Sequence, residues 1–257
     1  MSEPGPGTNV QLDASFHLAV LSQGVAGHVA DVRAALRSLD DGTYAVKADT
    51  ARPGAFLQFK LGSSGDSDEG ARTRLCNRCF VGMVGELITF IDRMIAFRRL
   101  LGTQMKVPPT VNTPQAVSEF VHSRLEEAYR EVATDTSLSN PKKLTTFAGI
   151  NDLSRRAALS YFSVRRAIEH HGHSPQTNID LVFGRMRLLA GDAEIVETGQ
   201  VLPEGTGISV GLHHSMRELA SGIEIAVRED ELEHVAFTIQ LLIGPEIARV
   251  ASGLPPT

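Results

Sequence analysis

The segment RTRLCNRCFVGMVGELITFIDRMIAFRRLL, residues 72–101, is the longest regular stretch of the 257-residue chain. Its apolar side chains recur at steps of three and four residues, the spacing that gathers side chains on one face of a helix. They are Leu75, Cys79, Met83, Leu87, Ile91, Met94, Ile95 and Leu101. The segment therefore predicts a long amphipathic helix. Gly82 and Gly85 would let another helix approach it closely, and Gly102 is suited to end it.

Three later segments carry the same helical pattern, over residues 114–133, 152–171 and 229–251. Thr113 and Pro114 suit the cap and the first position of a helix, so they set the start of the first of these segments. Amphipathic helices bury their apolar faces most simply against one another. We therefore predict a mainly α protein, an antiparallel four-helix bundle with a small β-containing insertion before the last helix.

The insertion is expected at about residues 178–227. It holds an apolar run, Ile179–Phe183, and an alternating run, Gly222–Val227, and glycine and proline punctuate the sequence between them. Short runs of this kind between turn residues are typical of strands. His213 and His214 lie in this region, and we interpret them as exposed loop histidines rather than as a metal or nucleophile site, because no motif of either kind accompanies them.

The first 70 residues are predicted to form an N-terminal lobe or extension with a loose tail. Residues 1 to about 13 are rich in glycine and proline. Residues 15–24 fit a short helix or strand, residues 27–39 a helix, and residues 55–61 a strand. The helical domain with its β insertion is expected over residues 71–251, and a tail over residues 252–257.

Composition narrows the class of protein. Hydrophobic residues make up 42% and charged residues 21%, as in ordinary soluble domains. Only Cys76 and Cys79 are present, so a disulfide framework is excluded and a cytoplasmic location is expected. No apolar run approaches the ~20 residues of a membrane span, so no membrane partner is expected. The net charge of −5 argues against a general nucleic-acid coat protein, but residues 72–106 carry seven basic side chains against two acidic ones, which leaves room for a local basic surface.

Most of the chemistry lies in residues 161–173, YFSVRRAIEHHGH. Two arginines and three histidines fall here, at the predicted end of the third bundle helix. The arginine fork suits phosphate oxygens, and imidazole gives or takes a proton near neutral pH. Those are the groups needed to cut RNA without a metal, one to move the 2'-hydroxyl proton and one to hold the charge on phosphorus.

Helical spacing adds detail to this cluster. Arg166 and His170 are four residues apart and share a face, and Arg165 and Glu169 form an ordinary ion pair. Gly172 is expected to end the helix. A purely structural interpretation also exists, because cationic side chains near a helix C-terminus stabilise the helix dipole.

The run from Val164 to Gly172, VRRAIEHHG, resembles the R-x4-6-H signature of the HEPN superfamily. The downstream layout is similar too, with the alternating run Gly222–Val227 followed by acidic residues and a last helix. The resemblance implies a helical bundle, frequently a homodimer, and in many members a metal-independent endoribonuclease of toxin–antitoxin or other defence systems. Other members of the superfamily bind RNA or dimerise without activity.

The resemblance also implies roles for single residues. His170 would be the general acid or base at the 2'-hydroxyl, and Arg165 would bind the scissile phosphate, giving a 2',3'-cyclic phosphate. Secondary phosphate contacts would come from Arg166, His171, His173 and Arg156. No metal or cofactor is needed. The chain departs from the family at Arg166, where a polar uncharged or acidic residue is usual. RNA, a second copy of the chain, and an antitoxin or other defence protein are the implied partners.

Two alternatives remain open at this point. Cys76 and Cys79 form a C-x-x-C pair, but a zinc site needs about four ligands, so two small buried side chains on a helix face are favoured. The alternative function is a non-catalytic helical interaction or dimerisation protein, in which the Arg/His cluster is structural.

Overall fold

The computed structural model describes residues 14–40, 68–101, 103, 107–108, 110–190, 193–194, 205 and 207–254. The strand expected at residues 55–61 and the cap expected at Gly102 lie outside these residues. Within them the protein is mainly helical with a small sheet, as predicted. No helix of the described residues is long and apolar enough to cross a membrane.

The long helices occupy the segments that show helical periodicity. They are α1 (Ser15–Asp40), α2 (Asp68–Leu101), α3 (Pro114–Thr134) and α5 (Asp152–His170), with the short α4 (Asn140–Thr145) between the last two. The final helix is continuous but changes winding, from α6 (Glu229–Phe237) through a π-helical turn, η1 (Thr238–Ile243), to α7 (Gly244–Ala251). The expectation of a break after residue 24 is wrong, because α1 runs through both of its central glycines.

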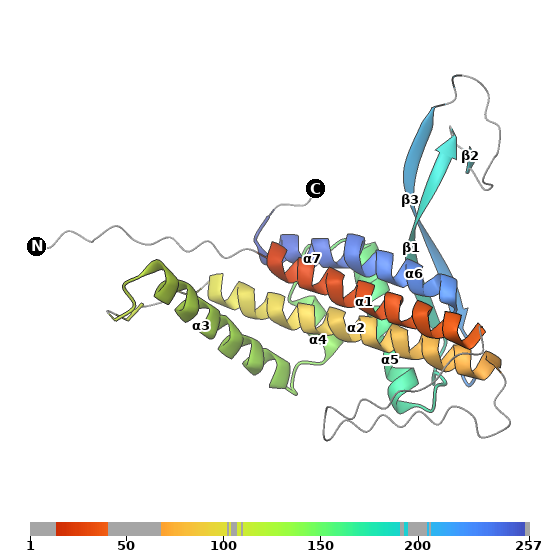
Figure 1. Cartoon of the computed structure of the whole chain (residues 1–257), viewed down its shortest axis with the longest axis horizontal. Coiled ribbons are helices and arrows are strands. Elements are labelled where there is room, and N and C mark those ends of the chain that lie inside the picture. The colour runs from red at the N-terminus through yellow and green to blue at the C-terminus, as the bar shows by residue number, and fades with distance from the viewer. Residues whose placement is uncertain are drawn as a thin grey trace, which may run out of the picture.

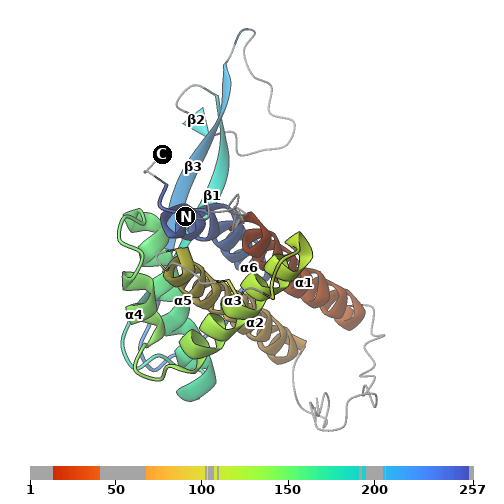
Figure 2. The same cartoon turned by 90° about the vertical axis from the view of Figure 1, so that its left-hand side faces the viewer.

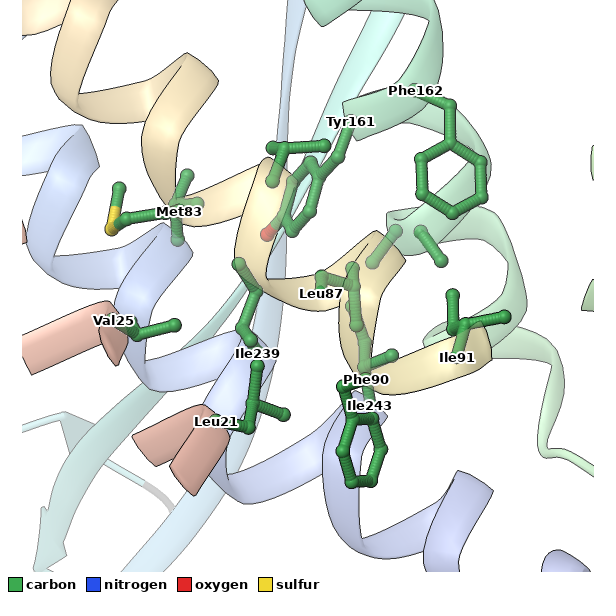
Figure 3. Packing of buried hydrophobic residues seen from close by; sticks show 14 of the residues in the cluster. Leu21, Val25, Met83, Leu87, Phe90, Ile91, Tyr161, Phe162, Ile239 and Ile243 are labelled. Atoms are coloured by element: carbon green, nitrogen blue, oxygen red, sulfur yellow. The ribbon is translucent and has the colours of Figure 1, made fainter. Parts of the chain in front are cut away.

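Helices α1, α2, α5 and the final helix share one core, which Figure 3 shows from close by. Leu21 of α1, Leu87 of α2 and Tyr161 of α5 are all almost fully buried there, together with residues of η1. Helix α1 packs along α2. Helix α3 packs beside the C-terminal end of α2 (Figures 1 and 2). The close approach expected at Gly82 is confirmed, because a Cβ there would lie 2.6 Å from Cε1 of His28 on α1.

The sheet is a long antiparallel hairpin with a short third strand. Strands β1 (Ile179–Ala190), β2 (Ala193–Glu194) and β3 (Ile208–Leu219) lie in the order β2-β1-β3. The base of the hairpin packs on α5 and the final helix, and its far half projects away from the helices (Figure 1). His213 and His214 lie on β3, so the interpretation of them as loop residues is wrong.

Gly222–Val227, predicted as a strand, begins in a turn at Gly222 and continues as irregular backbone, without strand partners in the described chain. A side chain takes the place of the neighbouring strand. Asn77 donates its Nδ2 to the carbonyl of Ile225 at 2.7 Å and accepts the N–H of Val227 at 3.0 Å. The N–H of Ile225 bonds to the carbonyl of His173 at 2.7 Å. Ile225 and Val227 are buried and Ile223 is exposed, and the backbone groups of this segment bond to residues distant in sequence rather than to a neighbouring strand.

Candidate functional site

Helix α5 carries the predicted site, and both of its ends are well defined. Asn151 caps its start, accepting the N–H of Ser154 at 2.8 Å, and Asp152 places a negative charge in the first turn. The N–H of His171 bonds to the carbonyl of Ala167 at 3.2 Å. Gly172 and His173 then take positive φ angles of 60° and 64°, so the helix ends where the sequence predicts.

A groove of about 490 Å³ runs beside α5. The helix forms one wall, and the segment 175–182, which folds back against it, forms the other. Arg156, Arg166 and His171 line this groove, so the structure brings three of the predicted phosphate-binding residues to one place. The volume falls within the range of small-ligand sites, about 300–1,000 Å³.

Arg165 does not line the groove. Its Nε and Nη2 atoms bond to the two carboxylate oxygens of Glu169 at 2.9 and 3.1 Å, the pair expected from the spacing. Its Nη1 lies 3.3 Å from where a Cβ at Gly85 would be, so the side chain lies against α2. A phosphate could reach this guanidinium only by displacing a two-point carboxylate contact.

His170 and His173 are exposed, and neither lines the groove. Arg165 and His170, the pair that matches the family signature, are therefore not brought together in this groove. The two exposed imidazoles lie on either side of the turn at Gly172.

Three adjacent pairs of cationic or titratable residues are each divided by the fold. Arg156, Arg166 and His171 line the groove, whereas their neighbours Arg155, Arg165 and His170 do not. Each step of one residue rotates the side-chain direction by about 100° around a helix, which is enough to send two neighbours to different surfaces. In each pair, the residue outside the groove is therefore the matched control for a substitution of the residue that lines it.

The groove residues differ in how firmly they are held. The side chain of Arg166 is exposed and has no ion pair or hydrogen bond to any described residue. Arg156 donates Nη2 to the sulfur of Met216 at 3.2 Å, a weak acceptor, and Nδ1 of His171 lies 3.4 Å from Nε2 of Gln176. Both guanidiniums therefore keep donors for an anion. Asp180, also in the lining, supplies one opposing negative charge.

The opposite wall is a rigid turn that sequence reasoning missed. Ser221 donates its Oγ to the carbonyl of Gln176 at 2.8 Å, and its N–H bonds to Oδ1 of Asn178 at 2.9 Å. The N–H of Gly222 bonds to the carbonyl of Pro175 at 2.9 Å. The only sequence signal was the polar run after the helix end, whereas the contacts that fix it come from about 45 residues later in the chain.

A metal centre has no support in the described residues, which contain no group of three or more His, Cys, Asp or Glu side chains placed to hold a metal ion. Cys76 and Cys79 are free and buried, as favoured. Burial raises the pKa of the Cys76 thiol to about 11 and that of Cys79 to about 12, so both stay neutral. Sγ of Cys79 donates to the carbonyl of His28 at 3.3 Å.

Comparisons with family models, with curated proteins and with solved structures found no match to this chain. Chemically, the groove offers two guanidiniums that can bind phosphate oxygens and one imidazole that can transfer a proton.

Proposed function

We propose that this protein binds RNA along the α5 groove and cleaves it without a metal, as active members of the HEPN superfamily do. The observation that carries the proposal is that Arg156, Arg166 and His171 line one groove of nucleotide size. The same proposal includes three further points: membership of the HEPN superfamily, the four-helix bundle of that superfamily, and a role in defence in the cytoplasm. They rest on the resemblance of residues 164–172.

Phosphate binding is the better supported step. The guanidinium of Arg166 is solvent-facing and without a partner among the described residues, so a phosphate would not have to displace a carboxylate. Arg156 lies ten residues earlier on α5, about 15 Å along the helix axis at 1.5 Å per residue. Two forks at that spacing suit two separated phosphates of one strand, and a fork binds phosphate at two points.

Cleavage would use the imidazole of the same groove. His171 takes the proton of a ribose 2'-hydroxyl, and the 2'-oxygen attacks the adjacent phosphorus. The bond from phosphorus to the 5'-oxygen breaks, the leaving oxygen takes a proton from water, and the hydroxide so formed takes back the proton held by His171. The products are a 2',3'-cyclic phosphate and a 5'-hydroxyl. Arg166 stabilises the charge that develops on the phosphate oxygens. The family signature assigns these two roles to His170 and Arg165 instead.

The experiment compares the two assignments within adjacent pairs. Purified protein is mixed with labelled single-stranded RNA in EDTA, and binding and cutting are measured separately. We expect Arg166→Ala and His171→Ala to lose cutting, and their neighbours Arg165→Ala and His170→Ala to keep it. Loss in the second pair alone would assign catalysis to the signature residues, and no cutting by the wild type would overturn the enzyme proposal.

Binding has its own readout. Removing one phosphate contact lowers the steepness of the dependence of log affinity on log salt by about 0.7 for single strands. We expect that change in Arg156→Ala and Arg166→Ala, with Arg155→Ala as the matched control on the same helix. Equal salt dependence in all three variants would overturn the groove as the RNA site.

A second candidate function is a non-catalytic interaction or dimerisation protein. The two-point ion pair of Arg165 with Glu169 favours it, because that pair gives the signature arginine a structural partner. An antitoxin or other defence protein would then be the partner. Wild-type protein that neither binds nor cuts RNA would favour this candidate over the first.

A further inference from the structure

The far half of the β1–β3 hairpin carries apolar side chains that nothing in the described structure covers. Met186 on β1 and Ile208, Val210 and Leu212 on β3 are 53–63% exposed. In the antiparallel register Met186 lies opposite Leu212, so these side chains point to the same face of the hairpin. Single exposed apolar residues are ordinary, but a row of them on one face of a projecting arm marks an interaction surface.

The base of the hairpin does not share this feature, because it is packed on the helices. Val182 and Phe183 are buried, and the N–H of Gly184 bonds to Oγ1 of Thr238 in η1 at 2.8 Å. Nε of Arg185 lies 3.0 Å from Nε2 of His234 on α6. The far half of the arm projects away from the helices (Figure 1). An isolated two-stranded hairpin is marginally stable in water, so a partner on the far half would stabilise it.

The outer edge of β3 is suited to accept another strand. Strand β1 lies between β2 and β3, so β3 is an edge strand within the described sheet. Its segment 208–216, ISVGLHHSM, contains no lysine, arginine, aspartate, glutamate or proline. Natural edge strands usually carry such residues because they prevent pairing with another strand. An edge of this length without them favours pairing.

We propose that β3 pairs with β3 of a second copy of this chain, antiparallel and about a two-fold axis at Leu212, to form one continuous sheet. An isologous contact needs a surface that is complementary to itself. In this register Leu212 faces Leu212 of the second copy and Ile208 faces its Met216. Val210 faces His214 of the second copy, and no permanent charges of like sign lie opposite each other.

The register extends the apolar row across both hairpins. Met186 is already opposite Leu212 within each copy. The order of side chains across the joined sheet is therefore Met186, Leu212, and then Leu212 and Met186 of the second copy. An unrelated strand would have to supply a matching row, whereas a second copy supplies it by symmetry. This inference does not rest on RNA binding, since Met186 and Leu212 lie outside the α5 groove, although Met216 at the end of the paired segment contacts the groove residue Arg156.

Cysteine crosslinking tests the register. The natural cysteines are buried and their thiols stay neutral, so they react slowly with a short bismaleimide. Leu212→Cys places two thiols directly opposite each other at the axis. Val210→Cys is the matched control, because its two thiols would lie ~13 Å apart along the strands. We expect a crosslinked dimer from the first variant and little from the second, and equal crosslinking would overturn the proposed register.

Solution mass tests the interface itself. We expect the wild type to sediment as a dimer of the 27.7 kDa chain, and Leu212→Lys to sediment as a monomer because two ammonium groups would face each other. Ile223→Lys is the control, since Ile223 is 64% exposed, more than Leu212, but lies outside the sheet. Circular dichroism checks that each variant is folded. A wild type that stays monomeric at high micromolar concentration, or a Leu212→Lys variant that stays dimeric, overturns the proposal.

Discussion

The guanidinium of Arg165 and the carboxylate of Glu169 meet in a two-point ion pair one helical turn apart on α5, with N–O distances of 2.9 and 3.1 Å. Both side chains are about a quarter to a third exposed. Water therefore screens the pair, and its contribution to stability is small even though its geometry is good.

A double-mutant cycle measures this pair. We expect Arg165→Ala and Glu169→Ala each to lower the free energy of unfolding slightly, with a coupling of about 0.5 kcal/mol between them. Urea unfolding of the wild type, both single variants and the double variant gives the coupling. A coupling several times larger would mean that the pair is effectively buried, and would leave Arg165 unavailable to any phosphate.

The close contact of α1 and α2 predicts opposite effects at two glycines. A Cβ at Gly82 would lie 2.6–2.9 Å from three atoms of the His28 ring, whereas a Cβ at Gly27 meets nothing within 4 Å. Gly82→Ala should therefore destabilise the fold by about 1–3 kcal/mol through overpacking. Gly27→Ala should stabilise it by up to about 1 kcal/mol, because alanine is the better helix former. If thermal unfolding shows that both substitutions raise stability, or that both lower it, this packing of α1 on α2 would be contradicted.

The helix boundaries that local chemistry dictates were predictable from the sequence. Pro114 and Asn151 mark helix starts, and the turn at Gly172 ends α5, because caps and breakers act within a few residues. Helix α1 was divided in error, since Gly24 and Gly27 interrupt its apolar pattern. A Cβ at Gly24 would lie 2.8 Å from Cδ of Glu86, so that glycine serves a contact with α2 rather than a turn.

The groove could be predicted only in part. Helical spacing places Arg156 and Arg166 on α5, but which of them faces a groove depends on where residues 175–182 fold back. The position of residues 175–182 is fixed by hydrogen bonds from Ser221 and Gly222, which lie about 45 residues later in the chain. Strand β3 was missed although Ile208, Val210 and Leu212 alternate, because the glycines before it and the two histidines within it resemble loop composition.

Asn77 holds the irregular segment before α6, so its removal should lower the stability of the fold. Its amide bonds to the backbone of Ile225 and Val227, and it is 2% exposed. Asn77→Ala would leave a buried N–H and a buried carbonyl without partners, at about 1–3 kcal/mol for each unsatisfied group. We expect a loss of roughly 2–4 kcal/mol in urea unfolding. Gln115→Ala, an exposed amide on α3, is the control and should change stability very little. A loss below 1 kcal/mol would mean that water replaces both bonds.

His17 on α1 predicts a loss of stability in mild acid. Burial, chiefly, and then the charge of Arg93 lower the pKa of this imidazole, Glu126 opposes them, and His122 adds a small lowering effect. Its Nδ1 is buried without a hydrogen-bond partner in the described structure. In the unfolded chain the pKa is about 6.5, so between the lowered folded value and 6.5 the unfolded state binds more protons and stability falls as the pH falls.

Replacing this imidazole should remove that pH dependence. His17→Leu fills a similar space without a polar atom, so we expect it to gain stability relative to the wild type as the pH drops from 7.5 to 5, with the difference nearly constant above pH 7. Urea unfolding at several pH values measures the difference, and NMR titration of the His17 ring gives its pKa directly. A ring pKa of 6.5 would remove this pH dependence, and a higher pKa would reverse its sign, because the folded state would then bind the proton more tightly than the unfolded chain.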